Sequence, residues 1–201
     1  GGGGGTPTPG VTSIVDKVMT SGLFTDDVTA YSADKKCCVN IIGGTIGLQL
    51  DSTALDKISI IPLETASVLP SEYKGISRFY EIGSTGTTFN YLITISFDYS
   101  DIQLPSDTNE TDIIIVWGDS RGNWNKLESS VDISSKTVTA RINHFTPFGL
   151  VIPFSTAEYF TVTDLTISPS EVEVNQSATL SALVTNISTM SKTFEIDLKI
   201  D

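Results

Sequence analysis

The chain has 201 residues, with 12 Lys and Arg against 24 Asp and Glu, and therefore a net charge of −12. Such an acidic chain repels phosphate backbones and anionic lipid headgroups, which excludes nucleic acid and membrane surfaces as expected partners. The hydrophobic share of 39% is typical of folded proteins, and no apolar run approaches the roughly 20 residues that span a bilayer.

The N-terminal residues 1–10, GGGGGTPTPG, have the composition of a linker that is flexible at the glycines and stiffer around the prolines. Four patches rich in β-branched residues follow and predict strands at residues 11–19, 27–32, 37–42 and 58–63. Residues 11–19 also show helical spacing at Ile14, Val15 and Val18, but their β-branched majority favours a strand.

The two cysteines, Cys37 and Cys38, are adjacent in one of these predicted strands. Neighbouring side chains of a strand point to opposite faces, so a disulfide between them requires a distorted turn. We therefore expect both to be unpaired, one packed inward and one outward, with an intermolecular bridge as the alternative.

The clearest strand pattern lies at residues 91–99, where Tyr91, Ile93, Ile95, Phe97 and Tyr99 alternate with mostly polar residues, as in a strand with one buried face. The apolar run from Ile113 to Trp117 predicts a central strand covered on both faces.

The chain then continues with turns and short strands. Trp117 and Trp124 flank the turn sequence GDSRGN, which closes a predicted hairpin. Residues 131–133 and 137–143 alternate again, and residues 137–152, TVTARINHFTPFGLVI, are interpreted as the last two strands of a domain. Residues 11–152 thus predict an all-β fold, an antiparallel β-sandwich.

Residues 153–159 are interpreted as a second linker, and residues 160–201 as a partial immunoglobulin-like domain with strands at 160–167, 178–186 and 194–200. Three strands cannot cover their own apolar face, since sandwiches of this kind have about seven. We therefore expect that the polypeptide continues past Asp201, or that a neighbouring chain completes the domain by strand complementation.

Two family resemblances rest on these segments. The stretch from GTTFNYLITISFDYS through IIIVWGDSRGNWNKLESSVDISSKTVTARINHFTPFGLVI resembles a β domain of bacterial and archaeal cell-surface proteins, similar to the ZU-five and UPA modules. The tail VTDLTISPSEVEVNQSATLSALVTN looks like the opening strands of a CARDB-type immunoglobulin-like adhesion domain. The resemblances imply a surface-layer, adhesin or filament protein without a cofactor.

The first resemblance also implies a candidate reaction at His144-Phe145-Thr146. In some relatives a His-Phe-Ser sequence cleaves itself: the hydroxyl attacks the preceding carbonyl, the histidine acts as base, and water hydrolyses the resulting ester. Here Thr146 would replace the serine. The alternative is that His144 continues the inward face of residues 138–142 as a neutral core histidine.

Other candidate sites each have a plain structural alternative. Asn109, Asn175 and Asn186 satisfy the N-x-S/T rule for glycosylation, a triplet that also arises by chance in Ser/Thr-rich chains. Trp117 and Trp124 offer a sugar-stacking platform, or simply pack on each other across the hairpin. One loop carries four possible Ca²⁺ ligands that are otherwise solvated carboxylates, namely Asp98, Asp101, Asp107 and Asp112.

The sequence contains no catalytic triad ordering, phosphate loop or metal cluster, so we expect no enzyme and no cofactor. The leading hypothesis is an extracellular structural or adhesive module of a cell-surface protein, with copies of itself or other surface proteins as partners. The alternative is a module that binds a glycan or a protein through the loops around Trp117 and Trp124. A self-cleaving β domain is the remote third hypothesis.

Overall fold

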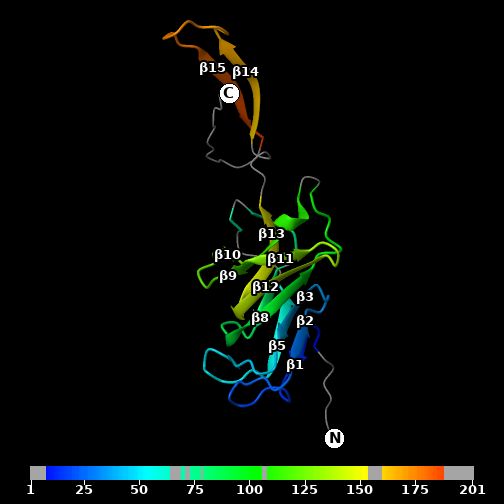
Figure 1. Ribbon diagram of the computed structural model, residues 1–201. Helices are drawn as coiled ribbons and strands as arrows, with labels where there is room; N and C mark the ends of the chain where they lie inside the picture. The colour runs from blue at the N-terminus through cyan, green and yellow to red at the C-terminus, as the bar shows by residue number, and fades with distance from the viewer. Residues whose placement is uncertain are drawn as a thin grey trace. The chain divides into compact units, whose positions relative to one another are not determined.

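The computed structural model of the chain describes residues 8–63, 69–70, 73–77, 79–105, 108–153 and 160–187. The chain divides into two compact units, unit 1 (Gly1–Pro153) and unit 2 (Phe154–Asp201). Both consist of antiparallel strands, as Figure 1 shows, and this confirms the predicted all-β class.

Unit 1 contains two sheets. The first sheet has the strand order β1-β5-β7-β13-β9-β10, with β6 also paired to β13, and the second has the order β11-β12-β8-β3-β2, with β4 paired to β8. The strands of the first sheet are β1 (Val11–Ser13), β5 (Lys57–Pro62), β6 (Tyr73–Gly75), β7 (Tyr80–Gly83), β9 (Ile114–Gly118), β10 (Trp124–Lys126) and β13 (Pro147–Pro153). Those of the second are β2 (Val28–Tyr31), β3 (Cys37–Ile41), β4 (Gly47–Leu48), β8 (Thr88–Asp98), β11 (Ser129–Asp132) and β12 (Thr137–His144).

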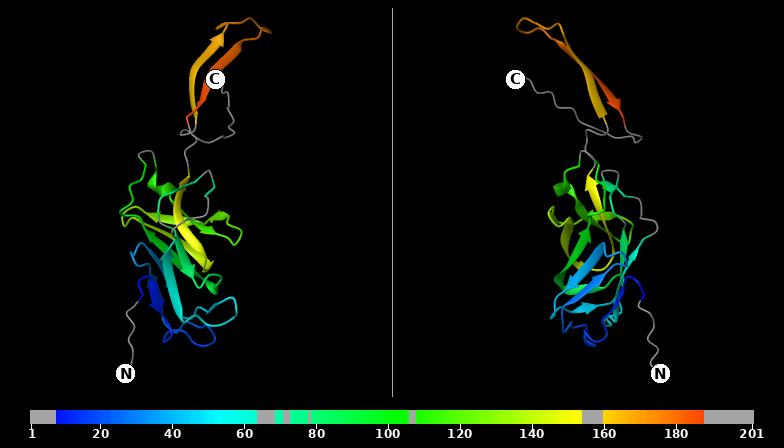
Figure 2. Two further views of the ribbon diagram at one scale, coloured as in Figure 1. Left: turned by 180° about the vertical axis from the view of Figure 1, so that it is seen from behind. Right: turned by 90° about the vertical axis from the view of Figure 1, so that its right-hand side faces the viewer.

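The two sheets lie face to face (Figure 2) and share one hydrophobic core. In the second sheet, the inward residues form rows across the strands because side chains alternate between the faces. Ala30, Val39, Ile95 and Ala140 make one such row through their pairings, in which two small alanines flank two larger residues. The alternation predicted for residues 91–99 is confirmed from Ile93 onward, whereas Tyr91 is exposed.

A second, smaller cluster covers the outer face of the first sheet. It contains Phe79, Val116, Trp124 and Val151, all buried. Ile115 of the same strand faces the main core, so β9 is covered on both faces as its apolar run predicted.

The last two strands of unit 1 do not pair with each other. β12 belongs to the second sheet and β13 to the first, so the chain crosses from one sheet to the other at Phe145-Thr146. Residues 137–152 thus contain the last two strands of unit 1, as predicted. Both strands exist, but their partners are β8 and β11 for β12, and β6, β7 and β9 for β13.

Two predictions for the N-terminal residues differ from the structure. Residues 11–19 form neither one long strand nor a helix, because β1 ends at Ser13 and a turn follows Ile14, which is buried in the core. Gly10, placed in the predicted linker, belongs to the fold: its carbonyl oxygen accepts a hydrogen bond of 2.7 Å from the backbone N–H of Ile60.

The cysteines are both free, Cys37 buried and Cys38 half-buried on the opposite face of β3. The predicted placement on two faces, without a disulfide between the two cysteines, is confirmed. Burial raises the pKa of the Cys37 thiol well above its usual value, which makes it a small apolar core residue.

The described part of unit 2 is a two-stranded antiparallel ribbon of β14 (Phe160–Ser168) and β15 (Thr179–Asn186). The predicted strand at residues 194–200 lies outside the described residues, as do residues 1–7 and 154–159 of the two predicted linkers.

Candidate functional site

The His144-Phe145-Thr146 segment sits at the corner where the chain changes sheets. Phe145 is fully buried and packs edge-on against Phe89, with 4.9 Å between the ring centroids. Its backbone N–H donates to the Thr87 carbonyl oxygen and its own carbonyl oxygen accepts from the Gly86 N–H, both at 2.9 Å. The loop between β7 and β8 therefore holds the corner on both sides of Phe145.

His144 is a packed, neutral side chain. Its ring meets Trp117 edge to face, with centroids 4.7 Å apart, and Nδ1 lies 2.9 Å from the side-chain oxygen of Asn143. Burial lowers the pKa of His144, so the ring is uncharged at pH 7. Nε2 is buried and has no hydrogen-bond partner among the described residues.

The hydroxyl of Thr146 donates its hydrogen bond to a group other than His144, the candidate base. Thr146 Oγ1 donates to the carbonyl oxygen of Pro147 at 3.1 Å, so its single proton is not shared with His144. A general base needs hydrogen-bond contact with the group that it deprotonates. The arrangement instead fits a structural corner in which Phe145 fills the core.

The two tryptophans lie on opposite faces of the first sheet. Trp124 is paired with Gly118 and Trp117 with Asn125, and adjacent residues of a strand face opposite ways. Trp124 packs on Phe79 in the outer cluster, at 4.8 Å between centroids. The two rings therefore neither pack on each other nor form one platform, which corrects both interpretations made from the sequence.

The candidate calcium ligands are divided. Asp98 and Asp101 flank the ammonium group of Lys36, with Nζ–Oδ distances of 3.3 and 3.1 Å, so a protein cation already lies between them. Asp112 is exposed in the short 3₁₀ helix η1 (Glu110–Asp112), and Asp107 lies outside the described residues. Within the described part of the chain, no three His, Cys, Asp or Glu side chains are grouped to hold a metal ion.

A cavity of about 380 Å³ opens beside this ion pair. Asp34 stands at its edge and accepts hydrogen bonds from the Tyr80 hydroxyl at 2.8 Å and from the Ser32 hydroxyl at 2.6 Å. Since Asp34, Asp98 and Lys36 are all engaged with neighbouring groups, the polar rim of the cavity is a bonded network that joins the ends of β3 and β8.

No protein-family model and no curated protein matches this chain. No helix within the described ranges is long and apolar enough to cross a membrane.

A second polar network, which was not predicted from the sequence, ties η1 to the turn before β12. Lys136 Nζ lies 2.7 Å from both carboxylate oxygens of Glu110, and the Tyr99 hydroxyl donates to Glu110 at 2.9 Å. Burial, followed by the bond to Glu110, raises the pKa of Tyr99 to about 12.

The raised pKa of Tyr99 predicts a loss of stability at high pH. The folded state favours the neutral phenol, so its contribution is complete below the unfolded-state pKa of about 10 and is lost as pH rises toward about 12. We expect the urea midpoint of the wild type to fall over this range, and to fall less in Tyr99→Phe. The exposed Tyr31→Phe is the control. Equal alkaline loss in Tyr99→Phe and wild type would show that another group is responsible.

The three asparagines of the glycosylation triplets are exposed. Asn109 caps η1, with its side-chain oxygen accepting from the Thr111 N–H at 3.2 Å, which leaves the amide nitrogen free of that bond. Asn175 lies in the loop between β14 and β15 with a φ of 72°, and Asn186 ends β15. Glycosylation of these positions stays a prediction.

Proposed function

We propose that the chain is an extracellular structural or adhesive module of a cell-surface protein, part of a surface layer, stalk or filament, that associates through unit 2. The observation that carries the proposal is the two-faced ribbon of β14 and β15. One of its faces presents large apolar side chains to solvent: Val162, Leu165, Ile167 and Leu180 are 56%, 67%, 55% and 41% exposed.

A bulge in β14 produces this apolar face. Val162 pairs with Val184 and Ile167 with Leu180, and the register shifts between Thr163 and Thr166. Residues 162 and 167 would point to opposite faces in a regular strand, but one extra residue in the bulge returns them to the same side. Asp164, with a φ of 53°, takes the left-handed conformation that the bulge requires.

The opposite face of the ribbon is polar. Its paired residues are threonine and serine apart from one leucine: Thr161, Thr163, Thr166, Ser168, Thr179, Ser181, Leu183 and Thr185. A two-stranded ribbon alone is marginally stable in water and gains stability when its apolar face is covered. This supports a role in which copies of the chain, or other surface proteins, pack on the ribbon or add a strand to it.

The free energies of side-chain burial and of association favour weak association that depends on concentration. Each apolar side chain of this size contributes about 1.5 to 3 kcal/mol when fully buried, and roughly half of that is still to be gained for side chains that are half exposed. Association costs about 4 to 15 kcal/mol in lost translational and rotational freedom. The gain from burying the four side chains of each copy is of the same order as this cost, so the net free energy of association is small. Such contacts are weak in dilute solution and effective where copies are tethered side by side.

The test is sedimentation velocity over a wide range of protein concentration, with electron microscopy of the concentrated sample. We expect the wild type to form oligomers or fibres as concentration rises, and Val162→Thr/Ile167→Thr to remain monomeric. Leu183→Thr is the matched control because Leu183 is also 54% exposed but lies on the polar face. A wild type that stays monodisperse at every concentration, with no fibres, contradicts the proposal.

A further inference from the structure

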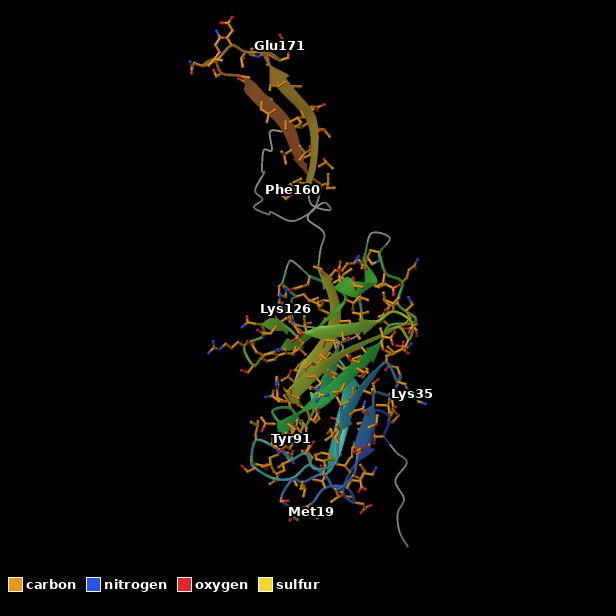
Figure 3. All side chains as sticks on the ribbon, viewed as in Figure 1. Met19, Lys35, Tyr91, Lys126, Phe160 and Glu171 are labelled. Carbon is orange, nitrogen blue, oxygen red and sulfur yellow. The ribbon has the colours of Figure 1, made fainter. Side chains whose placement is uncertain are left out.

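Three segments form one end of the sandwich in unit 1: residues 14–27, residues 42–56, which include β4, and residues 84–92, which include the start of β8. Figure 3 labels Met19 and Tyr91, which lie at this end. We call it the loop-end surface. Large apolar side chains are exposed on all three segments: Val15, Met19, Ile42, Ile46, Leu50, and, from the start of β8, Tyr91 and Leu92.

These side chains are concentrated rather than scattered. Among the described residues of unit 1, the other exposed large hydrophobic side chains are Tyr31, Ile61 and Ile133. On the loop-end surface, Leu50 is 82% exposed, Tyr91 65% and Ile42 62%. Isolated apolar side chains on a surface need no explanation, whereas a group of seven at one end marks an interaction site.

Backbone hydrogen bonds hold the three segments together. Gly47 N–H donates to the Gly22 carbonyl oxygen at 3.0 Å, and Gly44 N–H donates to that of Phe24 at 2.8 Å. Asn90 N–H donates to the Ile46 carbonyl oxygen at 3.0 Å, while the Asn90 side chain accepts from the Ile46 N–H at 2.7 Å. The surface is therefore preformed, which reduces the entropy lost when a partner binds.

The underlying core supports the same surface. Phe24 and Phe89, from two different segments, are buried beneath it with 6.4 Å between their ring centroids. The exposed apolar side chains thus sit on a packed base. Binding sites at the ends of β-sandwiches are commonly built in this way, from loops on a rigid scaffold.

The surface is also acidic. The three segments carry five aspartates and one lysine, a net charge of −4, and a further cation, Arg141, lies against them and donates to the Leu92 carbonyl oxygen at 3.4 Å. Asp16, Asp26, Asp27 and Asp51 are exposed, and none of them forms an ion pair with the described Lys or Arg side chains. Hydrogen bonds from Thr53 lower the pKa of Asp51, so its carboxylate stays ionised at neutral pH.

We propose that the loop-end surface docks a partner protein that presents apolar side chains flanked by lysine or arginine. The carboxylates complement a basic rim and repel an anionic membrane. They also oppose a second copy of this chain, which itself carries a net charge of −12. Six of the seven exposed side chains are aliphatic, which suits a protein partner better than a sugar, whose rings stack on aromatic residues.

The test uses a synthetic peptide of alternating leucine and lysine as probe, followed by amide chemical shifts of the ¹⁵N-labelled full chain. We expect the shifts to be confined to the loop-end surface and the affinity to fall as salt is added. Met19→Ser/Leu50→Ser should weaken binding about tenfold or more, and Val15→Ser/Ile42→Ser should do the same. Ile61→Ser/Ile133→Ser is the matched control and should bind as the wild type does.

Several outcomes would overturn this proposal. Shifts spread over the whole acidic surface, or equal binding by Met19→Ser/Leu50→Ser, would show that only charge is recognised. Equal binding of a peptide with glutamate in place of lysine would remove the charge argument. Self-association that Met19→Ser/Leu50→Ser abolishes would identify a second copy as the occupant. All these measurements concern unit 1, so they are independent of association through the ribbon of unit 2.

Discussion

Replacing Phe145 by alanine is expected to lower the free energy of unfolding of unit 1 by about 3 to 5 kcal/mol. Phe145 is fully buried at the corner between the two sheets and packs on Phe89. The corner is anchored by backbone bonds to Thr87 and Gly86 on both sides of Phe145, so it has little freedom to collapse into the space that the ring leaves. Urea unfolding followed by tryptophan fluorescence measures the loss, because Trp117 and Trp124 both lie in unit 1.

The matched control is Tyr91→Ala, which also removes an aromatic ring but from a side chain that is 65% exposed. We expect it to change stability by no more than about 0.5 kcal/mol. Thr146→Val tests the self-cleavage interpretation of the His144-Phe145-Thr146 motif, since it deletes the hydroxyl that would attack and retains the shape of the side chain. If Phe145→Ala proved as mild as Tyr91→Ala, Phe145 would not be the anchor of the corner.

The sequence predicted local features well because strands have a local signature. Alternation with a period of two marks the inward residues Ile93, Ile95 and Phe97, and the continuous run of β9 indicates burial on both faces. These patterns depend only on which side of a strand each residue faces. They therefore indicate strands without indicating which strand lies beside which.

The sequence patterns did not indicate how distant strands pair. Residues 137–152 contain two strands, but their assignment to different sheets depends on partners far away in the chain. The ion pair of Lys36 with Asp98 joins residues that are 62 positions apart. The sequence pattern around Asp98 therefore does not indicate that a lysine, rather than a calcium ion, lies beside its carboxylate.

The length of the loop between β9 and β10 determines which face of the sheet each tryptophan occupies. Five residues, 119–123, connect Gly118 to Trp124, which pairs those two residues and leaves Trp117 on the other face. Asp119 closes this loop by accepting hydrogen bonds from the Arg121 and Asn123 N–H groups. The Asp and Gly of GDSRGN indicated a turn, but the sequence did not specify its register.

Gly149→Ala is expected to destabilise unit 1 by about 1 to 3 kcal/mol, although it adds a single methyl group. Gly149 is buried in β13, and a Cβ atom there would lie 2.3 Å from Cδ1 of the Phe79 ring. Phe79 cannot easily move aside, because its ring packs edge-on against Trp124 in the outer cluster. Overpacking therefore has to shift the ring or the strand.

The matched control is Gly118→Ala, another buried glycine of the same sheet. Its Cβ would lie 3.5 Å from the Trp124 ring, an ordinary contact, so we expect a clearly smaller change. In the double variant Gly149→Ala/Phe79→Ala the clash is absent, so its cost should fall below the sum of the two single changes by about 1 to 3 kcal/mol. Strict additivity in this cycle, measured by urea unfolding, would mean that Phe79 does not restrict residue 149. The coupling would instead establish that the glycine is required because the aromatic cluster on the outer face of β13 occupies the space of its side chain.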